Sequence, residues 1–139
     1  MNRFWRDLSD TLLVLPCSFI VDRFWADPHP KIPLAKFTPY IDAYLKAHPG
    51  ALVLLATDDA ANHASLLARY PGKVVSAGSG YRTANIVRDP SIDRHAKGRT
   101  ALVDALLLAH TDFLLKGTSS LSEFALWYSP TLIERHLDL

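Results

Sequence analysis

The sequence predicts an α/β domain with a doubly wound, mostly parallel sheet. From residue 34 onward, segments with the three- and four-residue spacing of amphipathic helices alternate with short apolar runs. Uninterrupted apolar runs of this length are typical of strands that are covered on both faces in a parallel sheet. The joints between the segments are short, which is the pattern of helices and strands that alternate through a doubly wound sheet.

Length and composition indicate one folded domain. The chain has 139 residues, of which 49% are hydrophobic and 21% charged, and its net charge is +1. This composition argues against disorder and against a polyanion-binding tail, so we expect no nucleic-acid partner. Cys17 is the only cysteine, which excludes an intrachain disulfide and a zinc ribbon. We expect residues 34–139 to form the domain proper, preceded by a strand and loop over residues 1–33.

The most apolar segment of the chain is too short to span a membrane. Residues 11–21 are about half the roughly 20 residues that a spanning helix needs, and Pro16 interrupts them. Asp7 and Asp10 argue against the positively charged start of a signal peptide. We therefore expect a cytoplasmic protein in which residues 11–21 supply one more strand.

Helices and strands are expected to alternate from residue 35 to residue 76. A helix over 35–48 ends at Pro49-Gly50, and the apolar run 51–56 follows as a buried strand. A helix over 60–70 and a short strand over 73–76 come next. The side chains expected to face the core are Phe37, Tyr40, Ile41, Tyr44 and Leu45 in the first helix, and Ala64, Leu67 and Ala68 in the second.

Residues 77–97 have no clear period and are expected to form a long loop. A helix over 98–110, a strand over 112–115 and a helix over 120–128 follow, with Trp127 and Tyr128 packed in the core or at its edge. Basic side chains gather in and just after the loop, either as a solvated surface or as a mobile arm that closes on a diphosphate. They are Arg82, Arg88, Arg94, Lys97 and Arg99.

The first candidate site is formed by Thr57, Asp58 and Asp59, directly after the strand 51–56. In open parallel sheets, ligands bind beyond the carboxyl ends of the strands. One of the two carboxylates suffices to cap the next helix by accepting its free N–H groups. The other repels it, which leaves a second role open: contact with a ribose hydroxyl or with a basic loop.

The second candidate site is the segment 116–123, directly after the strand 112–115. Ser120 and Glu123 have the S-x-x-E spacing of a capping box, which predicts a helix start at Ser120. A helix start carries unpaired N–H groups and a partial positive charge, and Thr118, Ser119 and Ser120 surround it with hydroxyl groups. The segment is therefore either a plain serine-rich cap or a phosphate cradle.

The third candidate is Asp104, within the apolar run 101–109 of a predicted helix. A buried carboxylate without a partner is costly, and no cation lies three or four residues away along the helix. Its partner must therefore come from elsewhere: a distant Arg or Lys, an N–H group of another element, or the edge of a ligand base. A guanine edge and a structural salt bridge both remain open.

The sequence gives no sign of a metal site. The six histidines lack the H-x-x-x-H spacing and comparable ligand spacings. Gly78-Ser79-Gly80 is not followed by the GK[ST] of a phosphate-binding Walker loop. We expect neither a metal nor a bound cofactor.

Three segments occur in a characteristic order and spacing: LLATDD at 54–59, LVDALLLAHTDFLL at 102–115 and TSS at 118–120. Together they resemble the C-terminal part of the GDP-fucose-dependent fucosyltransferases, a family that includes the nodulation-type and core α-1,6-fucosyltransferases. These enzymes have two Rossmann-like halves in a GT-B-type arrangement. The resemblance covers roughly residues 30–139, so it implies that this chain is one Rossmann-like half.

The resemblance implies a role for each matching position. Asp104 falls where the family reads the guanine base with a carboxylate, and Ser119 and Ser120 fall where hydroxyl groups and helix N–H groups hold the diphosphate. Residues 57–59 match the T-D-D motif that lines the same cleft. The implied ligand is a nucleotide-sugar donor such as GDP-fucose, bound without a metal.

The chain departs from the family at residues 21–27. The family has an H-x-R-x-T-D-like motif there, whose Arg binds the β-phosphate, whereas this chain reads VDRFWAD, with Arg23 one position out of register and no His. The N-terminal acceptor half also has no counterpart. We therefore expect glycosyl transfer to a glycan or other acceptor only if a second chain supplies that half, with either residues 12–20 or Leu137 and Leu139 offering it apolar surface. The alternative is a truncated or degenerate, non-catalytic Rossmann-like module that acts through a partner.

Overall fold

The computed structural model describes residues 11–14, 32–57, 59–76, 91, 93–117 and 120–139. For residues 11–14 and 120 it describes the backbone alone. All structural statements below concern these residues.

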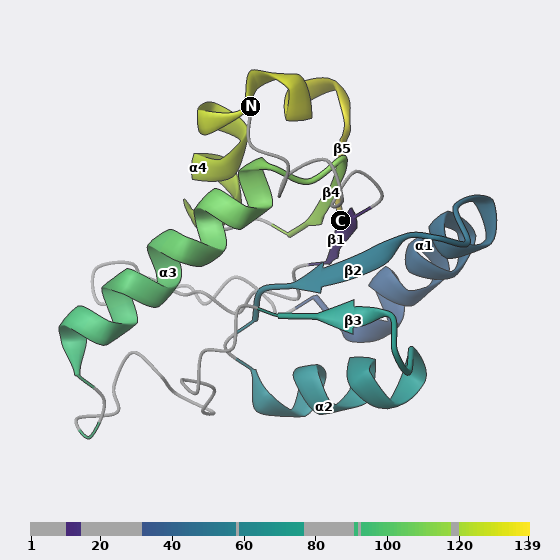
Figure 1. Cartoon of the computed structure of the whole chain (residues 1–139), viewed down its shortest axis with the longest axis horizontal. Coiled ribbons are helices and arrows are strands. Elements are labelled where there is room, and N and C mark those ends of the chain that lie inside the picture. Colours follow the sequence, from purple (N-terminus) through teal and green to yellow (C-terminus); the bar gives the residue numbers. More distant parts are fainter. Residues whose placement is uncertain (1–10, 15–31, 58, 77–90, 92, 118–119) are drawn as a thin grey trace.

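Five parallel strands form one sheet. They lie in the order β3-β2-β1-β4-β5, so the chain adds two strands on one side of β1 and then crosses to add two on the other (Figure 1). The register pairs Leu13 of β1 with Leu54 on one side and with Leu114 on the other. The strands are β1 (Thr11–Val14), β2 (Leu52–Leu55), β3 (Val74–Val75), β4 (Phe113–Lys116) and β5 (His136–Asp138).

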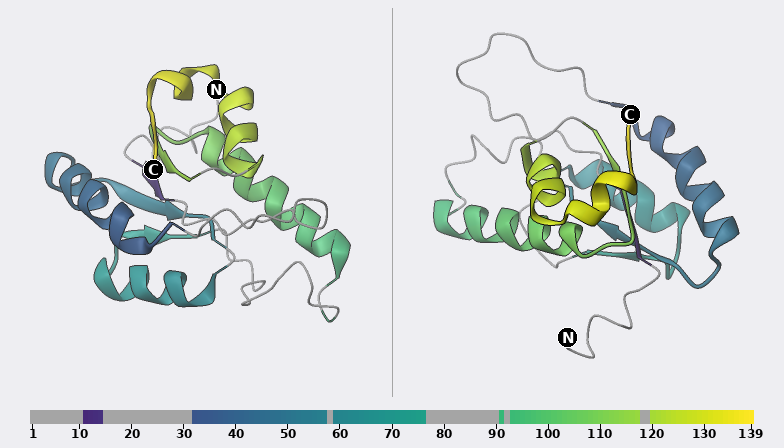
Figure 2. Two further views of the ribbon diagram at one scale, coloured as in Figure 1. Left: turned by 180° about the vertical axis from the view of Figure 1, so that it is seen from behind. Right: turned by 90° about the horizontal axis from the view of Figure 1, so that it is seen from above.

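Helices cover the sheet, and two apolar clusters form where they meet it (Figure 2). Successive side chains of a strand point to opposite faces. Val53 and Leu55 accordingly join the cluster with α1 and α2, whereas Leu54 packs against the cluster with α3 and α4. The helices are α1 (Leu34–Ala47), α2 (Ala60–Arg69), α3 (Arg94–Ala109), α4 (Ser120–Tyr128) and the short 3-10 helix η2 (Pro130–Glu134). The predicted α/β class is confirmed.

Polar contacts at the end of α2 fasten it to α1. The Tyr70 hydroxyl donates to Asp42 Oδ1 at 2.7 Å, and Arg69 donates to Asp42 Oδ2 at 2.8 Å. Burial, followed by the hydrogen bond to Asp42, raises the pKa of Tyr70 to about 12. The hydrogen bond from Tyr70 lowers the pKa of Asp42 below its usual value.

Several predictions about facing and boundaries are wrong. Ala64, Leu67 and Ala68 are exposed, because α2 turns Leu66 and Tyr70 to the core instead. In the first helix, Phe37 and Ile41 are fully buried and Tyr44 and Leu45 partly so, but Tyr40 is 47% exposed.

The helix expected to begin at Gly98 begins at Arg94, because the Asp93 carboxylate accepts hydrogen bonds from the N–H groups of His95 and Ala96. Arg94, Lys97 and Arg99 therefore lie on α3 and not in a mobile arm; Arg82 and Arg88 fall outside the described residues.

The end of the chain also differs from expectation. Trp127 is 83% and Tyr128 56% exposed, so neither is a core residue. Leu137 and Leu139 pack against the cluster under α1 and α2 and are only partly open to a partner. Of the predicted strand 11–21, residues 11–14 form β1, and the rest lie outside the described residues.

Candidate functional site

The strand order changes direction at β1, which is flanked by β2 and β4 (Figure 1). In open α/β sheets, ligands bind beyond the carboxyl ends of the strands where the strand order reverses, because the connecting chains leave in opposite directions there. Residues 57–59 follow β2 and residues 117–120 follow β4. The described residues of both predicted segments, Thr57 and Asp59 on one side of β1 and Gly117 and Ser120 on the other, therefore lie at the carboxyl edge.

Asp59 is the cap of α2. Its Oδ1 accepts hydrogen bonds from Ala61 N at 2.9 Å and from Asn62 N at 3.0 Å, and Asp59 N donates to the buried Thr57 Oγ1 at 3.1 Å. The prediction that one of the two carboxylates caps this helix is thus confirmed. Oδ2 of Asp59 makes no hydrogen bond within the part of the chain that the structure describes. Asp58 lies outside the described residues.

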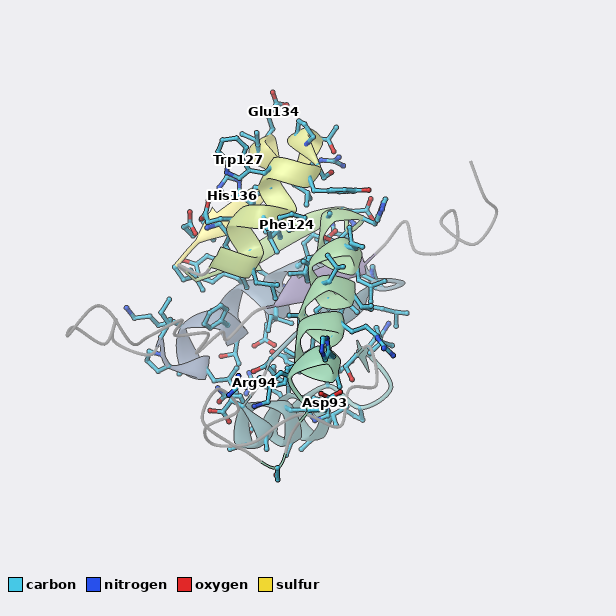
Figure 3. The ribbon with its side chains drawn as sticks, turned by 90° about the vertical axis from the view of Figure 1, so that its left-hand side faces the viewer. Asp93, Arg94, Phe124, Trp127, Glu134 and His136 are labelled. Atoms are coloured by element: carbon cyan, nitrogen blue, oxygen red, sulfur yellow. The ribbon has the colours of Figure 1, made fainter. Side chains whose placement is uncertain are left out.

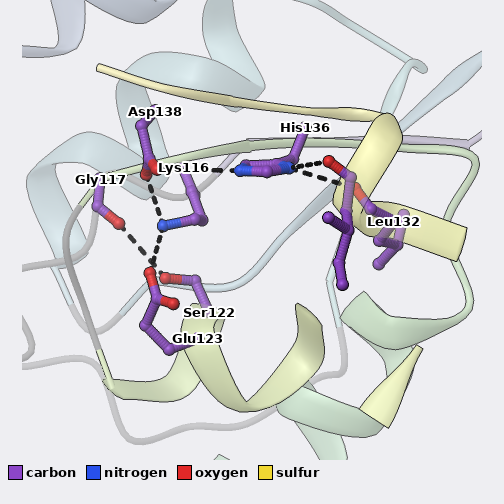
Figure 4. A network of polar contacts seen from close by, with 8 residues as sticks. Lys116, Gly117, Ser122, Glu123, Leu132, His136 and Asp138 are labelled. Atoms are coloured by element: carbon purple, nitrogen blue, oxygen red, sulfur yellow. Dashed lines mark hydrogen bonds and ion pairs between the residues drawn. The ribbon is translucent and has the colours of Figure 1, made fainter. Parts of the chain in front are cut away.

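Lys116, the last residue of β4, is the most deeply buried charged side chain among the described residues, with 1% exposure. Its ammonium group forms ion pairs with Glu123 in the first turn of α4 and with Asp138 at the end of β5 (Figure 4). Burial disfavours the charged form, but the hydrogen bonds to Asp138 and Glu123 outweigh it and raise the pKa of Lys116 above its ordinary value of 10.5. The two carboxylates stay about half exposed, at 49% and 55%.

This cluster is not itself an anion site. One ammonium group faces two carboxylates, which leaves an excess of one negative charge when all three are ionised. The start of a helix carries a partial positive charge, and α4, a helix of nine residues, begins at this edge. A phosphate here would have to be held chiefly by backbone.

The start of α4 is confirmed at Ser120, but the capping box is not. The Glu123 carboxylate pairs with Lys116 and does not reach back to the helix start. Ser122, buried, donates from Oγ to Gly117 O at 3.2 Å and so fixes the joint between β4 and α4. Gly117 approaches Ile32 closely, because a Cβ there would lie 2.7 Å from Ile32 Cδ1. Thr118 and Ser119 lie outside the described residues, as does the side chain of Ser120.

Asp104 lies in α3, which packs against α4. Its side chain is half-buried and has a polar partner. Leu102 and Val103 beside it are 53% and 42% exposed, and α3 faces the core through Ala105 and Leu108. Arg23, the residue considered for the diphosphate, lies outside the described residues.

Sequence reasoning missed the ionic cluster of Lys116, Glu123 and Asp138, and with it His136. The His136 ring lies with Nδ1 2.9 Å from Ile133 O and Nε2 3.8 Å from Asp138 Oδ2. One signal was available: a lysine at the end of an otherwise apolar strand needs a tertiary partner. No spacing along the chain could have identified Asp138 as that partner.

No group of three or more His, Cys, Asp or Glu side chains suited to a metal ion occurs among the described residues. In the same part of the chain, none of the helices has the length and apolar character needed to cross a membrane. Comparison with protein-family models, with curated proteins and with solved structures finds no match. Function is therefore inferred from the residues and the fold alone.

Proposed function

We propose that this chain is a nucleotide-sugar-binding domain, Rossmann-like and equivalent to one half of a GT-B glycosyltransferase. It would bind GDP-fucose or a similar donor and take part in glycosyl transfer when a second half supplies the acceptor side. The observation that carries the proposal is the strand order β3-β2-β1-β4-β5, with the starts of α2 and α4 following the two strands that flank β1.

The diphosphate is assigned to the start of α4. Backbone N–H groups at a helix start can bind phosphate oxygens, and α4 begins directly after the joint that follows β4. Lys116 is already paired with Glu123 and Asp138, so it adds little positive charge. The remaining charge has to come from an arginine, and Arg23 is the residue that the family resemblance offers.

The nucleoside is assigned to Asp104 and Asp59. A carboxylate can accept two hydrogen bonds from a guanine edge, and in Asp104 these would replace the contact made in the free protein. Oδ2 of Asp59 is available to a ribose hydroxyl while Oδ1 caps α2. Both roles use carboxylate oxygens as acceptors, which suits a ligand with several donor groups.

Thermal unfolding with and without nucleotide tests the proposal. A ligand present at about 100 times its Kd stabilises the folded state by about 2.7 kcal/mol, so saturating GDP should raise Tm by several degrees, and ADP should not. Asp104→Asn should abolish the GDP-dependent rise. Asp42→Asn is the matched control, because Asp42 contacts Arg69 and Tyr70 between α1 and α2; it should lower Tm but keep the response to GDP.

Two results would count against the assignment. Calorimetry that detects no binding of GDP at about millimolar concentration by the folded chain would refute nucleotide binding. A Tm that Asp104→Asn lowers by the same amount with and without GDP would show that Asp104 is structural.

The second candidate is a non-catalytic module of the same fold. The excess of negative charge around Lys116 favours it, because a catalytic site must stabilise a leaving diphosphate with positive charge. Incubation with GDP-fucose and a panel of glycan acceptors separates the two candidates. Sugar transfer by the chain that is lost in Asp104→Ala would exclude the non-catalytic module.

A further inference from the structure

The outer side of α4 presents large apolar side chains to solvent. Phe124, Trp127 and Tyr128 are 42%, 83% and 56% exposed, and Ile133 of the adjoining η2 is 57% exposed. We call these four residues the aromatic face. On its inner side the same helix buries Ala125, Leu126 and Ser122. A helix that is apolar on both sides is typical of an element that is covered on both sides.

Two of the three rings of this face are already held in place. Phe124 and Tyr128 are stacked, with ring centroids 6.1 Å apart and planes 27° apart, and His110 of the α3 C-terminus meets Tyr128 edge-on at 6.3 Å. Figure 3 shows Phe124 and Trp127 on α4, with Glu134 at the same end of the molecule. Because the Phe124 and Tyr128 rings are pre-organised, covering these two rings costs little side-chain entropy.

The aromatic face is large enough to be the centre of a protein interface. At the observed exposures, its four side chains present roughly 500 Å² of surface to solvent. A stable interface buries about 800 Å² per partner, with a polar rim around an apolar centre. The rim side chains next to the face supply the remaining area.

The charges of that rim identify the partner that fits. Glu123 and Glu134 are acidic and Arg135 is basic, and all three are exposed. Glu134 has no ion-pair partner within the described part of the chain, and Arg135 directly follows it. In a contact between identical faces about a two-fold axis, residue i of one copy meets residue j of the other and the reverse, so a rim that carries both signs lets Glu134 of each copy pair with Arg135 of the other.

We propose that the aromatic face is the contact of a two-fold dimer of this chain, formed by packing α4 against α4 of a second copy. Trp127, the most exposed of the four side chains, is the anchor that inserts against the stacked Phe124 and Tyr128 of the other copy. The dimer does not depend on nucleotide binding, because the face is built on the outer side of α4 and on η2.

Sedimentation equilibrium of the whole chain from about 1 to about 300 µM tests the proposal. We expect a monomer–dimer equilibrium in which Trp127→Ala raises the dissociation constant at least about thirtyfold, as for a central anchor residue. Leu67→Ala is the matched control: Leu67 is a 43% exposed apolar residue of α2, which belongs to the other apolar cluster. That variant should dimerise like the wild type. Circular dichroism should show both variants folded, since both side chains are exposed.

Three outcomes would overturn the proposal: a wild-type chain that stays monomeric over the whole range, association that Trp127→Ala leaves unchanged, or association that both variants weaken equally. The GDP-dependent rise in Tm should survive in Trp127→Ala. Failure of the dimer and failure of nucleotide binding are therefore distinguishable.

Discussion

Replacing Lys116 by methionine tests whether the ionic cluster stabilises the fold. Methionine keeps most of the buried length of the lysine side chain and removes only its charge and donors. The substitution leaves Glu123 and Asp138 side by side without the ammonium group that joins α4 and β5 to β4. We expect the free energy of unfolding to fall.

The size of the loss follows from the exposure of the three groups. Breaking a fully buried ion pair costs about 3–5 kcal/mol, because the remaining charge is stranded. Here the two carboxylates are 49% and 55% exposed and can hydrate, whereas the lysine is 1% exposed. We therefore expect a loss of about 2–3 kcal/mol, which lowers Tm by roughly 5–10 °C. Lys116→Ala should cost roughly 2 kcal/mol more, because it also removes the buried methylene groups.

Urea unfolding followed by circular dichroism measures this loss. Lys36→Met is the matched control, because Lys36 is exposed on α1 and its loss should change stability by less than about 0.5 kcal/mol. The raised pKa of Lys116 also fixes the pH dependence. Its contribution is complete below the unfolded value of 10.5 and is lost as the pH rises through the folded value. The wild-type advantage over Lys116→Met should thus be constant between about pH 7 and about pH 9 and shrink above 10.5. A Lys116→Met variant as stable as the wild type at pH 7 would refute the reasoning.

Two further predictions concern stability outside the cluster. Tyr70→Phe should lose about 1 kcal/mol at neutral pH through the hydroxyl bond to Asp42. The unfolded tyrosine ionises near pH 10 and the folded one near pH 12, so the extra stability of the wild type over Tyr70→Phe should fall between these two pH values. Urea titrations measure this difference in the free energy of unfolding. A difference that stays constant over this range would contradict the raised pKa. Gly98→Ala should stabilise the chain by about 0.5–1 kcal/mol, because Gly98 lies inside α3 with open space around it. Gly72→Ala should destabilise it by about 1 kcal/mol, because its φ of +71° disfavours a side chain; equal shifts in Tm for the two alanines would show this reasoning to be wrong.

The alternation of helices and strands could be predicted up to α4, because each of those elements has a local signal. Apolar runs between turn residues identified β2 and β4, and helical spacing identified α1 and α4. β5 and η2 were missed, because three residues after a proline-led turn carry no period that distinguishes a strand. The choice of the inward face of α2 failed for a related reason: small alanines and Leu67 gave an apolar stripe, whereas burial follows the larger pair Leu66 and Tyr70.

The parts of the candidate site that could be predicted are those that depend on contacts between residues close together in the sequence. Asp59 as the helix cap and Ser120 as the start of α4 follow from local rules. The partners of Lys116 are set by the pairing of β4 with β5 and by the packing of α4, and no local rule contains either. The exposure of Trp127 likewise depends on how the helices pack on the sheet. The sequence of an apolar helix does not show whether one side or both sides of it are covered.

The excess negative charge around Lys116 makes it possible to test whether a bound diphosphate lies at the start of α4. Asp138 and Glu123 share the ammonium group of Lys116, so Asp138 lies close to the end of a side chain from the first turn of α4. Charges closer together than the Debye length of about 8 Å at physiological salt are only partly screened, so we expect Asp138 to repel a phosphate held at that helix start. Asp138→Asn removes the excess negative charge and leaves Lys116 paired with Glu123. The affinity for GDP measured by calorimetry should then rise a few fold, with Asp42→Asn unchanged, and the gain should shrink at high salt. If Asp138→Asn leaves the GDP affinity unchanged, the diphosphate does not bind at the start of α4, even if the chain binds GDP elsewhere.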